Sequence, residues 1–565
     1  MKESPRIDAA GGGGGTDRIS DLPSKVIHII LDRLNSPIQA ARTSALSRSW
    51  LQFWRSYPVL EFRHEDFADR RCDLGEKFSS FAAAWSRRLS DHDNYGMPLD
   101  VFRISSPPNR DFAGEELTAL LASAAALAVN HTLSPVEIVV ETDGFHDFPE
   151  GLLSNCSRTE VLKLRGCRLD DDDGFRNRSV SFDSLRVFHL QNVKVDESVL
   201  RRFVANATRL ESLRLGSLVE LERLEISADG NFPNLKTLII EQPHSLIELK
   251  LAAAPLLETL DIKHTGQCKL KVVSSSSAPS LKVLEFSDSK GLTGSDLDEL
   301  ISKLPSLESL HFVIKDPSSS SSSYRMDKIR ISSDKLLHFR IDDFHPIEAL
   351  KELEIDAPNL VNLYYSRRGS GLRGKINVLN VASNCQCLVE VFDIDFRLPI
   401  TYEWFLGLRQ FLTGLSKLHT VLKLDGAGFF KQVSFDLSQA DCTYPPPVVQ
   451  HLQFGENSAY QDGLKACDNL LDGLFWACRP KFVGITQRLP KQLKYSFLFS
   501  EYICGKLMNV DPGSCCGNGT CWRHQLKDVK IMNGVYGTSA GMMEISEDVF
   551  FSLVERKEVR YMFTW

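Results

Sequence analysis

The chain has 565 residues, of which 43% are hydrophobic and 25% are charged, a composition typical of a globular protein with several domains or one extended array. Its net charge of -7 argues against a nucleic-acid-binding protein, because no overall positive field would attract a phosphate backbone. The thirteen cysteines lack regular spacing, no secretory signal is visible and no apolar stretch is long enough to span a bilayer, so we expect reduced thiols, no membrane partner, and a place in the nucleus, the cytoplasm or both.

Residues 1–16 form a glycine-rich tail that we expect to be disordered, and residues 17–57 are predicted to form three short amphipathic helices. Ser36 and Gln39 make a capping box for the second helix, and Ser47 caps the third. The apolar stripe of the first helix consists of Val26, Ile27, Ile30, Leu31 and Leu34. The aromatic edge of the third consists of Trp50, Phe53, Trp54 and Tyr57. A module of about 40 residues is near the lower limit of what one core stabilises alone, so we expect a partner to cover these faces.

The order and spacing of Leu22-Pro23, the apolar stripe, Leu46-Ser47 and Trp50 resemble the plant-type F-box, which we assign to residues 17–60. The resemblance implies docking onto a Skp-type adaptor, which links the chain to a cullin and a RING subunit in an SCF ubiquitin ligase. The residues expected to bind the adaptor are Leu22, Pro23, Val26, Ile27, Ile30, Leu31, Leu34, Leu46, Trp50 and Trp54. The alternative, a helical cap on a larger domain, explains the amphipathicity but not the Leu-Pro start followed by a Ser-x-x-Trp ending.

Residues 61–97 are predicted to be a connecting region, in which Phe78, Phe81 and Trp85 indicate one helix that ties the F-box to the following domain. After it, the pattern predicts a strand at 99–105, a helix at 115–129 and a strand at 136–140. These three elements would form a longer first repeat that shields the open end of a stack, because terminal repeats are normally atypical.

A leucine frame then recurs through the middle of the chain, in which an anchor leucine is followed by apolar residues three and five positions later. The main anchors are Leu185, Leu210, Leu235, Leu257, Leu281, Leu307, Leu336 and Leu360. Their separations fall within or at the edge of the range of about 20 to 29 residues found in leucine-rich repeats. We therefore predict an α/β fold: a leucine-rich-repeat solenoid over residues 98–480, with a parallel concave sheet whose alternate side chains face the core.

Extra frames at Leu221, Leu246 and Leu350 lie too close to their neighbours for complete repeats, so we expect them to be strands on the convex side. Residues 196–205 and 295–304 are predicted to be connecting helices, which gives the convex side a mixed helix and strand character. This mixture resembles the plant F-box proteins with irregular leucine-rich repeats. The segment 521–531, followed by an expected helix at 545–556, resembles the FBD-type ending of that family, so residues 481–565 are predicted to be an FBD-like cap.

Motifs for catalysis or metal binding are weak. Cys515, Cys516, Cys521 and His524 offer zinc-ligand atoms, but adjacent cysteines point their side chains apart and no second Cys-x-x-Cys exists, so we expect no metal and no cofactor. Residues 537–541 fit G-x-S-x-G, yet no histidine follows them to complete a hydrolase triad. The acidic run at 170–173 lacks the alternating spacing of a calcium loop. We therefore expect a non-catalytic protein.

The outward positions of the early strand frames are basic: Lys163, His189 and Arg214, with Arg165 adding to them. One hypothesis is that they bind an acidic or phosphorylated segment of a protein target, and the alternative is an ordinary solvated face. Three functions of different kinds remain open: a ligase receptor, a repeat scaffold outside any ligase, and an enzyme. A ligase receptor predicts co-purification with the adaptor, whereas a repeat scaffold outside any ligase predicts that the N-terminal helices fold back on the repeats and leave no exposed apolar stripe.

Overall fold

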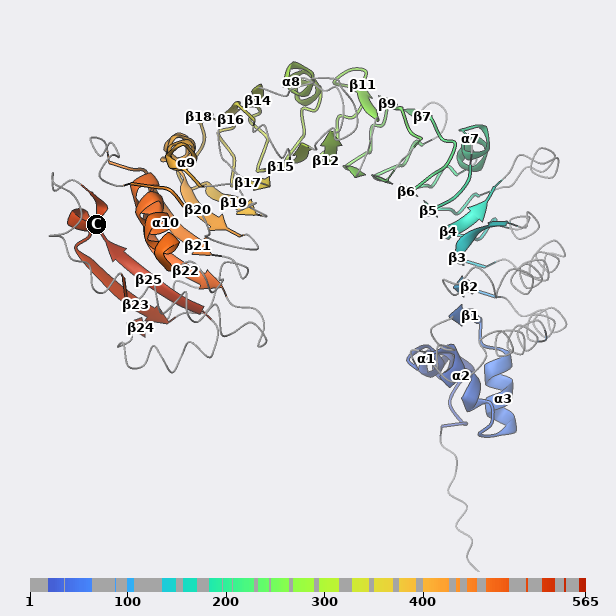
Figure 1. Ribbon diagram of the computed structural model, residues 1–565. Coiled ribbons are helices and arrows are strands. Elements are labelled where there is room, and N and C mark those ends of the chain that lie inside the picture. The colour runs from blue at the N-terminus through green and yellow to red at the C-terminus, as the bar shows by residue number, and fades with distance from the viewer. Residues whose placement is uncertain are drawn as a thin grey trace, which may run out of the picture. The chain divides into compact units, whose positions relative to one another are not determined.

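The computed structural model describes the following residues, and every structural statement below concerns these alone: 19–34, 36–63, 87, 99–105, 135–148, 156–169, 182–195, 197–205, 207–227, 232–242, 245–263, 268–288, 294–314, 328–344, 350–368, 375–392, 400–425, 433–436, 445–454, 464–486, 505–506, 521–533, 543–544 and 558–565. The chain divides into two compact units, one formed by residues 1–221 with 230–234 and the other by 222–229 with 235–565. Figure 1 labels the helices and strands of each unit. None of the described helices is long and apolar enough to cross a membrane.

The first unit begins with three short helices, which we call the helical module (residues 19–57). They are α1 (Ser24–Asp32), α2 (Pro37–Thr43) and α3 (Arg48–Arg55). The Ser47 side chain caps α3 by accepting a hydrogen bond of 3.2 Å from the Trp50 backbone N–H, as predicted. Ser36 precedes α2 in an extended conformation, but its side chain makes no capping hydrogen bond, so the predicted capping box is absent at this end.

A parallel sheet follows the helical module in the same unit. Its strands are β1 (Val59–Arg63), β2 (Val101–Ser105), β3 (Glu137–Asp147), β4 (Val161–Arg168), β5 (Val187–Gln191) and β6 (Ser212–Gly216). Each pairs with the next in chain order. The sheet begins earlier than the predicted boundary at residue 98, because Val59 to Arg63 pair in register with Val101 to Ser105. The helix after β5, α7 (Glu197–Ala205), lies where one was predicted, whereas the helix predicted at 115–129 falls outside the described residues.

The second unit also contains a parallel sheet, in which ten described strands pair in chain order. They are β8 (Thr237–Glu241), β10 (Thr259–Lys263), β12 (Val283–Asp288), β13 (Ser309–Ile314), β15 (His338–Asp343), β17 (Asn362–Arg368), β19 (Gln386–Phe392), β20 (His419–Leu424), β21 (Val448–Phe454) and β22 (Arg479–Thr486). The residues at +3 and +5 of each frame, such as Leu260 and Ile262, are fully buried. The predicted α/β fold class, helices followed by a repeat solenoid, is therefore confirmed.

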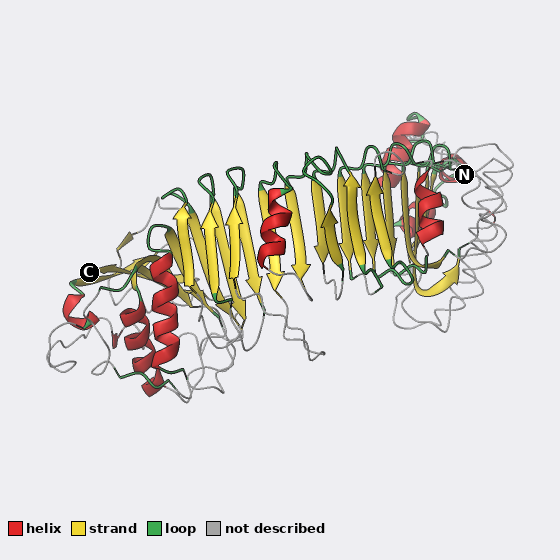
Figure 2. Cartoon of the chain, turned by 90° about the horizontal axis from the view of Figure 1, so that it is seen from above, coloured by secondary structure: helices red, strands yellow, loops and turns green. Residues whose placement is uncertain are grey.

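A second layer of elements covers the repeats of this unit. It contains one sheet of β7 (Arg223–Ser227), β9 (Glu248–Ala253) and β11 (Lys269–Val272), and another of β14 (Lys328–Ser332), β16 (Glu352–Asp356) and β18 (Lys375–Asn380). The extra frames at Leu221, Leu246 and Leu350 run into β7, β9 and β16. The predicted helix near residue 295 is α8 (Gly294–Ser302), which interrupts the row of strands in Figure 2.

Helices close both edges of the second outer sheet. The helix α8 packs against β14, and α9 (Tyr402–Gly414) packs against β18. Each contact is made through a glycine: a Cβ atom added to Gly294 would lie 1.7 Å from the Lys328 carbonyl oxygen, and one added to Gly414 would lie 1.8 Å from that of Ile376. Only a residue without a side chain fits at this distance, which lets each helix lie directly against the strand. The helices thereby cover strand edges that would otherwise be open to pairing.

The parallel sheet of the second unit ends in an antiparallel closure. The strand β25 (Glu558–Thr564) pairs with β22 on one side and with β23 (Asp528–Asn533) on the other, and the short β24 (Met543–Glu544) pairs antiparallel with the end of β23. The helices α10 (Leu464–Ala477) and α12 (Trp522–Gln525) pack beside it through Phe475 and Trp522, whose rings lie 4.8 Å apart. The helix predicted at 545–556 lies outside the described residues, so the FBD-like ending stays a prediction.

Candidate functional site

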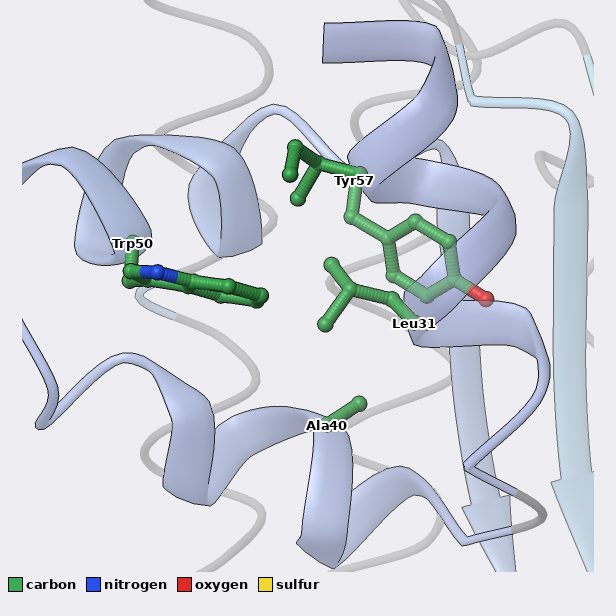
Figure 3. Packing of buried hydrophobic residues seen from close by; sticks show 5 residues of the cluster. Leu31, Ala40, Trp50 and Tyr57 are labelled. Atoms are coloured by element: carbon green, nitrogen blue, oxygen red, sulfur yellow. The ribbon is translucent and has the colours of Figure 1, made fainter. Parts of the chain in front are cut away.

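The helical module encloses a small core of its own. Ile27, Leu31, Ala40, Trp50 and Tyr57 are each at most 7% exposed. Figure 3 shows Leu31, Ala40 and Trp50 converging from different segments, with the Tyr57 ring beside Leu31. The Tyr57 hydroxyl also donates a hydrogen bond to the Asp32 carboxylate at the end of α1. We expected an outside partner to cover the apolar faces, but Tyr57 and the partly buried Val59, which lie beyond α3, complete this core from within the chain.

The ten residues predicted to bind the adaptor divide into three classes by their positions. Ile27, Leu31 and Trp50 belong to the core, so their side chains do not reach the surface of the module. Ile30, Leu34 and Trp54 are partly buried against that core. The four on the surface are Leu22, Pro23, Val26 and Leu46. The sequence pattern alone does not separate these classes, because a core residue and a docking residue on a short helix are equally apolar.

The surface of the module carries an apolar row that the sequence analysis missed in part. Val26 and Ile29 lie on α1, Ile19 and Leu22 lie in the turn before it, and these four are 37–57% exposed; Leu46, between α2 and α3, is 68% exposed. We call these five residues the apolar row. The spacing of three and four residues was a usable signal for Ile29, but the longer stripe through Ile27 and Leu31 obscured it. Exposed apolar residues gathered on one small module are typical of a protein interaction surface.

The helical module contacts the first strands of the sheet. A cavity of about 500 Å³ lies at the junction, and its walls include Leu31, Trp54 and Val101. On its polar side, Arg103 of β2 donates to Glu61 of β1 at 2.6 Å and to Glu137 of β3 at 2.9 Å. Burial of Glu61 would by itself raise the pKa of its carboxyl, but hydrogen bonds from Arg63 and Arg103 hold that pKa below its usual value. This ladder of charges stabilises the pairing of β1 with β2 and β3.

The structure brings together the four residues predicted to bind a target. Lys163 on β4, His189 on β5 and Arg214 on β6 lie in one register row, directly opposite one another on neighbouring strands. Arg165 is the next outward residue on β4 and pairs with Gln191. Arg165 and Arg214 are exposed, and Lys163 and His189 are half-buried. All four therefore share the outward face of the sheet in the first unit.

The corresponding outward row of the second unit is also charged, but its charges pair with one another. The Lys263 ammonium lies 2.7 Å from the Asp261 carboxylate. The His311 ring lies between two carboxylates, with Nδ1 at 3.1 Å from Glu285 and Nε2 at 2.7 Å from Asp342. Further along the sheet, the Arg340 guanidinium sits 4.3 Å above the Tyr364 ring. The Tyr364 hydroxyl donates to Glu390, which in turn pairs with Lys423.

The chemistry-bearing groups outside these surfaces form no further site among the described residues. Burial raises the pKa of the Cys156, Cys167 and Cys268 thiols to about 12, so they stay protonated and unreactive near neutral pH. No group of three His, Cys, Asp or Glu side chains is placed to hold a metal ion within the described ranges. Cys515, Cys516, the acidic run at 170–173 and the G-x-S-x-G segment at 537–541 lie outside the residues that the structure describes.

Comparison with known proteins gives two matches to family models and several similar plant proteins. Residues 19–62 match the F-box domain model, and residues 135–293 match the model described as FBD-associated F-box protein At5g56370, LRR repeats. The chain is 29% identical over 264 residues to the F-box/FBD/LRR-repeat protein At4g00160 of Arabidopsis thaliana, covering 45% of this chain and 54% of the relative.

Two further proteins from the same plant are similar. The chain is 30% identical over 236 residues to the F-box/LRR-repeat protein At3g26922, covering 41% of this chain and 69% of the relative. It is 28% identical over 259 residues to the F-box/FBD/LRR-repeat protein At3g52680, covering 40% of this chain and 51% of the relative. The match spans about half the length of the two relatives whose names include FBD.

Proposed function

Because this chain belongs to the plant F-box/leucine-rich-repeat family, we propose that it is the target-recognition subunit of an SCF-type cullin–RING ubiquitin ligase. Its helical module docks onto a Skp-type adaptor, which connects it to the cullin and the RING subunit. Its repeats hold a target protein. The chain makes and breaks no bond in this role; it holds the target near the ubiquitin-charged enzyme and raises the effective concentration of the two reactants.

The apolar row is the observation that carries this proposal. The core of the helical module is already filled by Ile27, Leu31 and Trp50, so Leu22, Val26 and Ile29 are not needed to complete it. Their exposure has a cost in water that a bound partner would remove. A repeat scaffold outside a ligase predicts that the helices fold back on the repeats and leave no exposed apolar stripe. Of the predicted stripe only Val26 is exposed, so the support for the receptor comes from Val26 together with its neighbours Leu22 and Ile29.

The junction between the module and the sheet supports the same role. Tyr57 belongs to the core of the module, the Pro58 carbonyl accepts hydrogen bonds of 2.8 and 3.1 Å from the Asp100 and Val101 N–H groups, and β1 follows at once. The described chain therefore passes from α3 into the sheet without a flexible tether. Docking the module would also orient the outward face of β1 to β6, which a receptor needs in order to present a bound target.

Co-expression with a Skp-type adaptor tests the proposal. The full chain should retain the adaptor in equal amounts on an affinity resin, and Val26→Asp with Leu46→Asp should abolish retention because carboxylates replace apolar contacts at an interface. Val219→Asp is the matched control, since Val219 is 39% exposed and Val26 is 38% exposed, but Val219 lies outside the module. Circular dichroism should show that all variants are folded. Unchanged retention by the double variant would exclude the apolar row as the docking surface, whereas no retention by the unmodified full chain would leave the scaffold as the better reading.

A further inference from the structure

The outward face of β4, β5 and β6 has an unusual charge composition. Three positions on each strand face outward in matched rows, and all but Gly216 carry a side chain. In strand order, the nine are Val161, Lys163, Arg165, Val187, His189, Gln191, Ser212, Arg214 and Gly216. Lys163, Arg165 and Arg214 are cationic, His189 can become so, and no aspartate or glutamate occupies any of the nine positions. Two valines at the start of the rows add an apolar edge.

The neighbouring strands of the same unit differ. On β1, β2 and β3 the outward rows hold Glu61, Glu137 and Glu141 against two arginines, and Arg103 is bound by two of these glutamates. In the second unit the outward charges also pair along the sheet, as in the contacts of His311 with Glu285 and Asp342. The nine outward positions of β4 to β6 thus hold only neutral and basic residues, and the acidic residues that follow them in register are Glu137 and Glu141 on β3, opposite Val161 and Arg165.

We propose that this face binds an acidic segment of the target protein, a proposal that rests on the receptor function above and names the partner of its repeats. Guanidinium and ammonium groups form their strongest hydrogen bonds with carboxylate or phosphate oxygens, and arginine binds either with two parallel bonds. Neighbouring strands lie about 4.8 Å apart, so Lys163, His189 and Arg214 form a row about 10 Å long. A few carboxylates, or a phosphate with one carboxylate beside it, would span that row, while an apolar residue of the segment packs on Val161 and Val187.

The surroundings favour a short protein segment over a nucleic acid. A phosphate backbone that extended past β4 would meet the β3 residues Glu141, which lies opposite Arg165, and Glu137, which lies opposite Val161 two rows away. The chain as a whole also has a net charge of -7, which repels a long polyanion. A short acidic segment with its own apolar residue could contact Lys163, His189 and Arg214 without reaching those carboxylates.

Binding of the full chain, purified with its adaptor, to arrayed random-sequence peptides with and without phosphoserine tests the proposal. Peptides rich in Asp, Glu or phosphoserine should be enriched, and Lys163→Glu with Arg214→Glu should weaken their binding by about tenfold or more, because two attractive contacts become repulsive. The matched control is Lys269→Glu with Lys271→Glu on β11, which changes the net charge equally at exposed positions of the outer sheet. If the double charge reversal impairs folding, Lys163→Gln with Arg214→Gln should still weaken the binding of acidic peptides, by a smaller factor.

The outcomes separate this proposal from the receptor function. Enrichment of neutral or basic peptides would contradict the proposed binding face, and so would an equal loss of acidic-peptide binding in the β11 control. Either result would leave the evidence from adaptor retention unaffected. Enrichment of acidic peptides by a chain that retains no adaptor would keep the face and remove the ligase role. A preference for Asp and Glu peptides over phosphoserine peptides, or the reverse, identifies the source of the negative charge. Binding of a single-stranded RNA oligonucleotide as strong as that of the acidic peptides, lost in the same variant, would replace the protein segment with a nucleic acid.

Discussion

Arg103 on β2 donates a hydrogen bond of 2.6 Å to Glu61 on β1, which ties the first strand after the helical module to the rest of the sheet. Arg63 adds a second hydrogen bond to the same carboxylate at 2.8 Å. Burial by itself would raise the pKa of the Glu61 carboxyl, but these hydrogen bonds outweigh burial and lower that pKa. Because the folded pKa is below the unfolded value, the folded state binds fewer protons, so this stabilisation is present above the unfolded pKa and is lost as pH falls through the folded pKa.

We therefore expect Glu61→Gln to lower the free energy of unfolding by about 1–2 kcal/mol at neutral pH, a value discounted because Arg103 is partly exposed. Chemical denaturation at several pH values should show the difference from the unmodified chain shrinking as pH falls below about 4. A difference that stays constant across this range would mean that the ion pair contributes nothing to the pH dependence. Glu211→Gln is a suitable control, since its pair with Arg186 lies at an exposed site.

Trp50→Ala should unfold the helical module and not merely remove a docking contact. The Trp50 ring fills the centre of the small core and meets Phe53 edge-on at 6.2 Å, so truncation should cost about 3–5 kcal/mol. Hydrogen exchange of residues 24–55 should become fast in this variant. Leu46→Ala, at a highly exposed position, should leave exchange unchanged, and equal protection in both variants would contradict the assignment of Trp50 to the core.

The two glycines that contact strand edges should not tolerate a methyl group. Gly414→Ala places a Cβ atom 1.8 Å from the Ile376 carbonyl oxygen, so α9 must move away from β18. We expect a loss of about 1–3 kcal/mol from this strain, more than the gain of about 0.5–1 kcal/mol that alanine brings to a helix. Gly505→Ala is the control, because no described atom would lie within 4 Å of its Cβ. Thermal unfolding that shifts equally in both variants would contradict the close contact.

Removal of the Asp343 carboxylate should be among the most damaging changes in the second unit. The Arg367 Nη1 atom lies 2.7 Å from Asp343 Oδ2, and both side chains are at most 2% exposed. Asp343→Ala leaves the guanidinium charge buried, and we expect a loss of about 3–5 kcal/mol in denaturant unfolding. Arg330→Ala breaks a half-exposed ion pair with Glu354 and should cost about 1 kcal/mol or less. Similar losses in the two variants would argue against a desolvated pair.

The repeat frames were predictable from the sequence because burial alternates along a short strand. Leu257, Leu260 and Ile262 all reach the core as expected. The strands β14 and β18 were missed, since Lys328 to Ser332 and Lys375 to Asn380 follow no leucine anchor at the spacing of the repeat frame. At the helical module the pattern identified the helices but not their inner and outer faces. That division depends on Tyr57 and Val59, which complete the core from beyond α3, where Val59 also pairs with Val101 of β2.

The direct passage from Pro58 into β1 places the helical module and β1 to β6 in one compact unit. If the apolar row holds the adaptor and β4 to β6 hold the target, this unit fixes the distance between the adaptor and the bound segment. Target lysines beyond that reach would be spared even when the segment binds well. Extra residues inserted after Pro58 would then alter which lysines are modified while leaving the affinity for the segment unchanged.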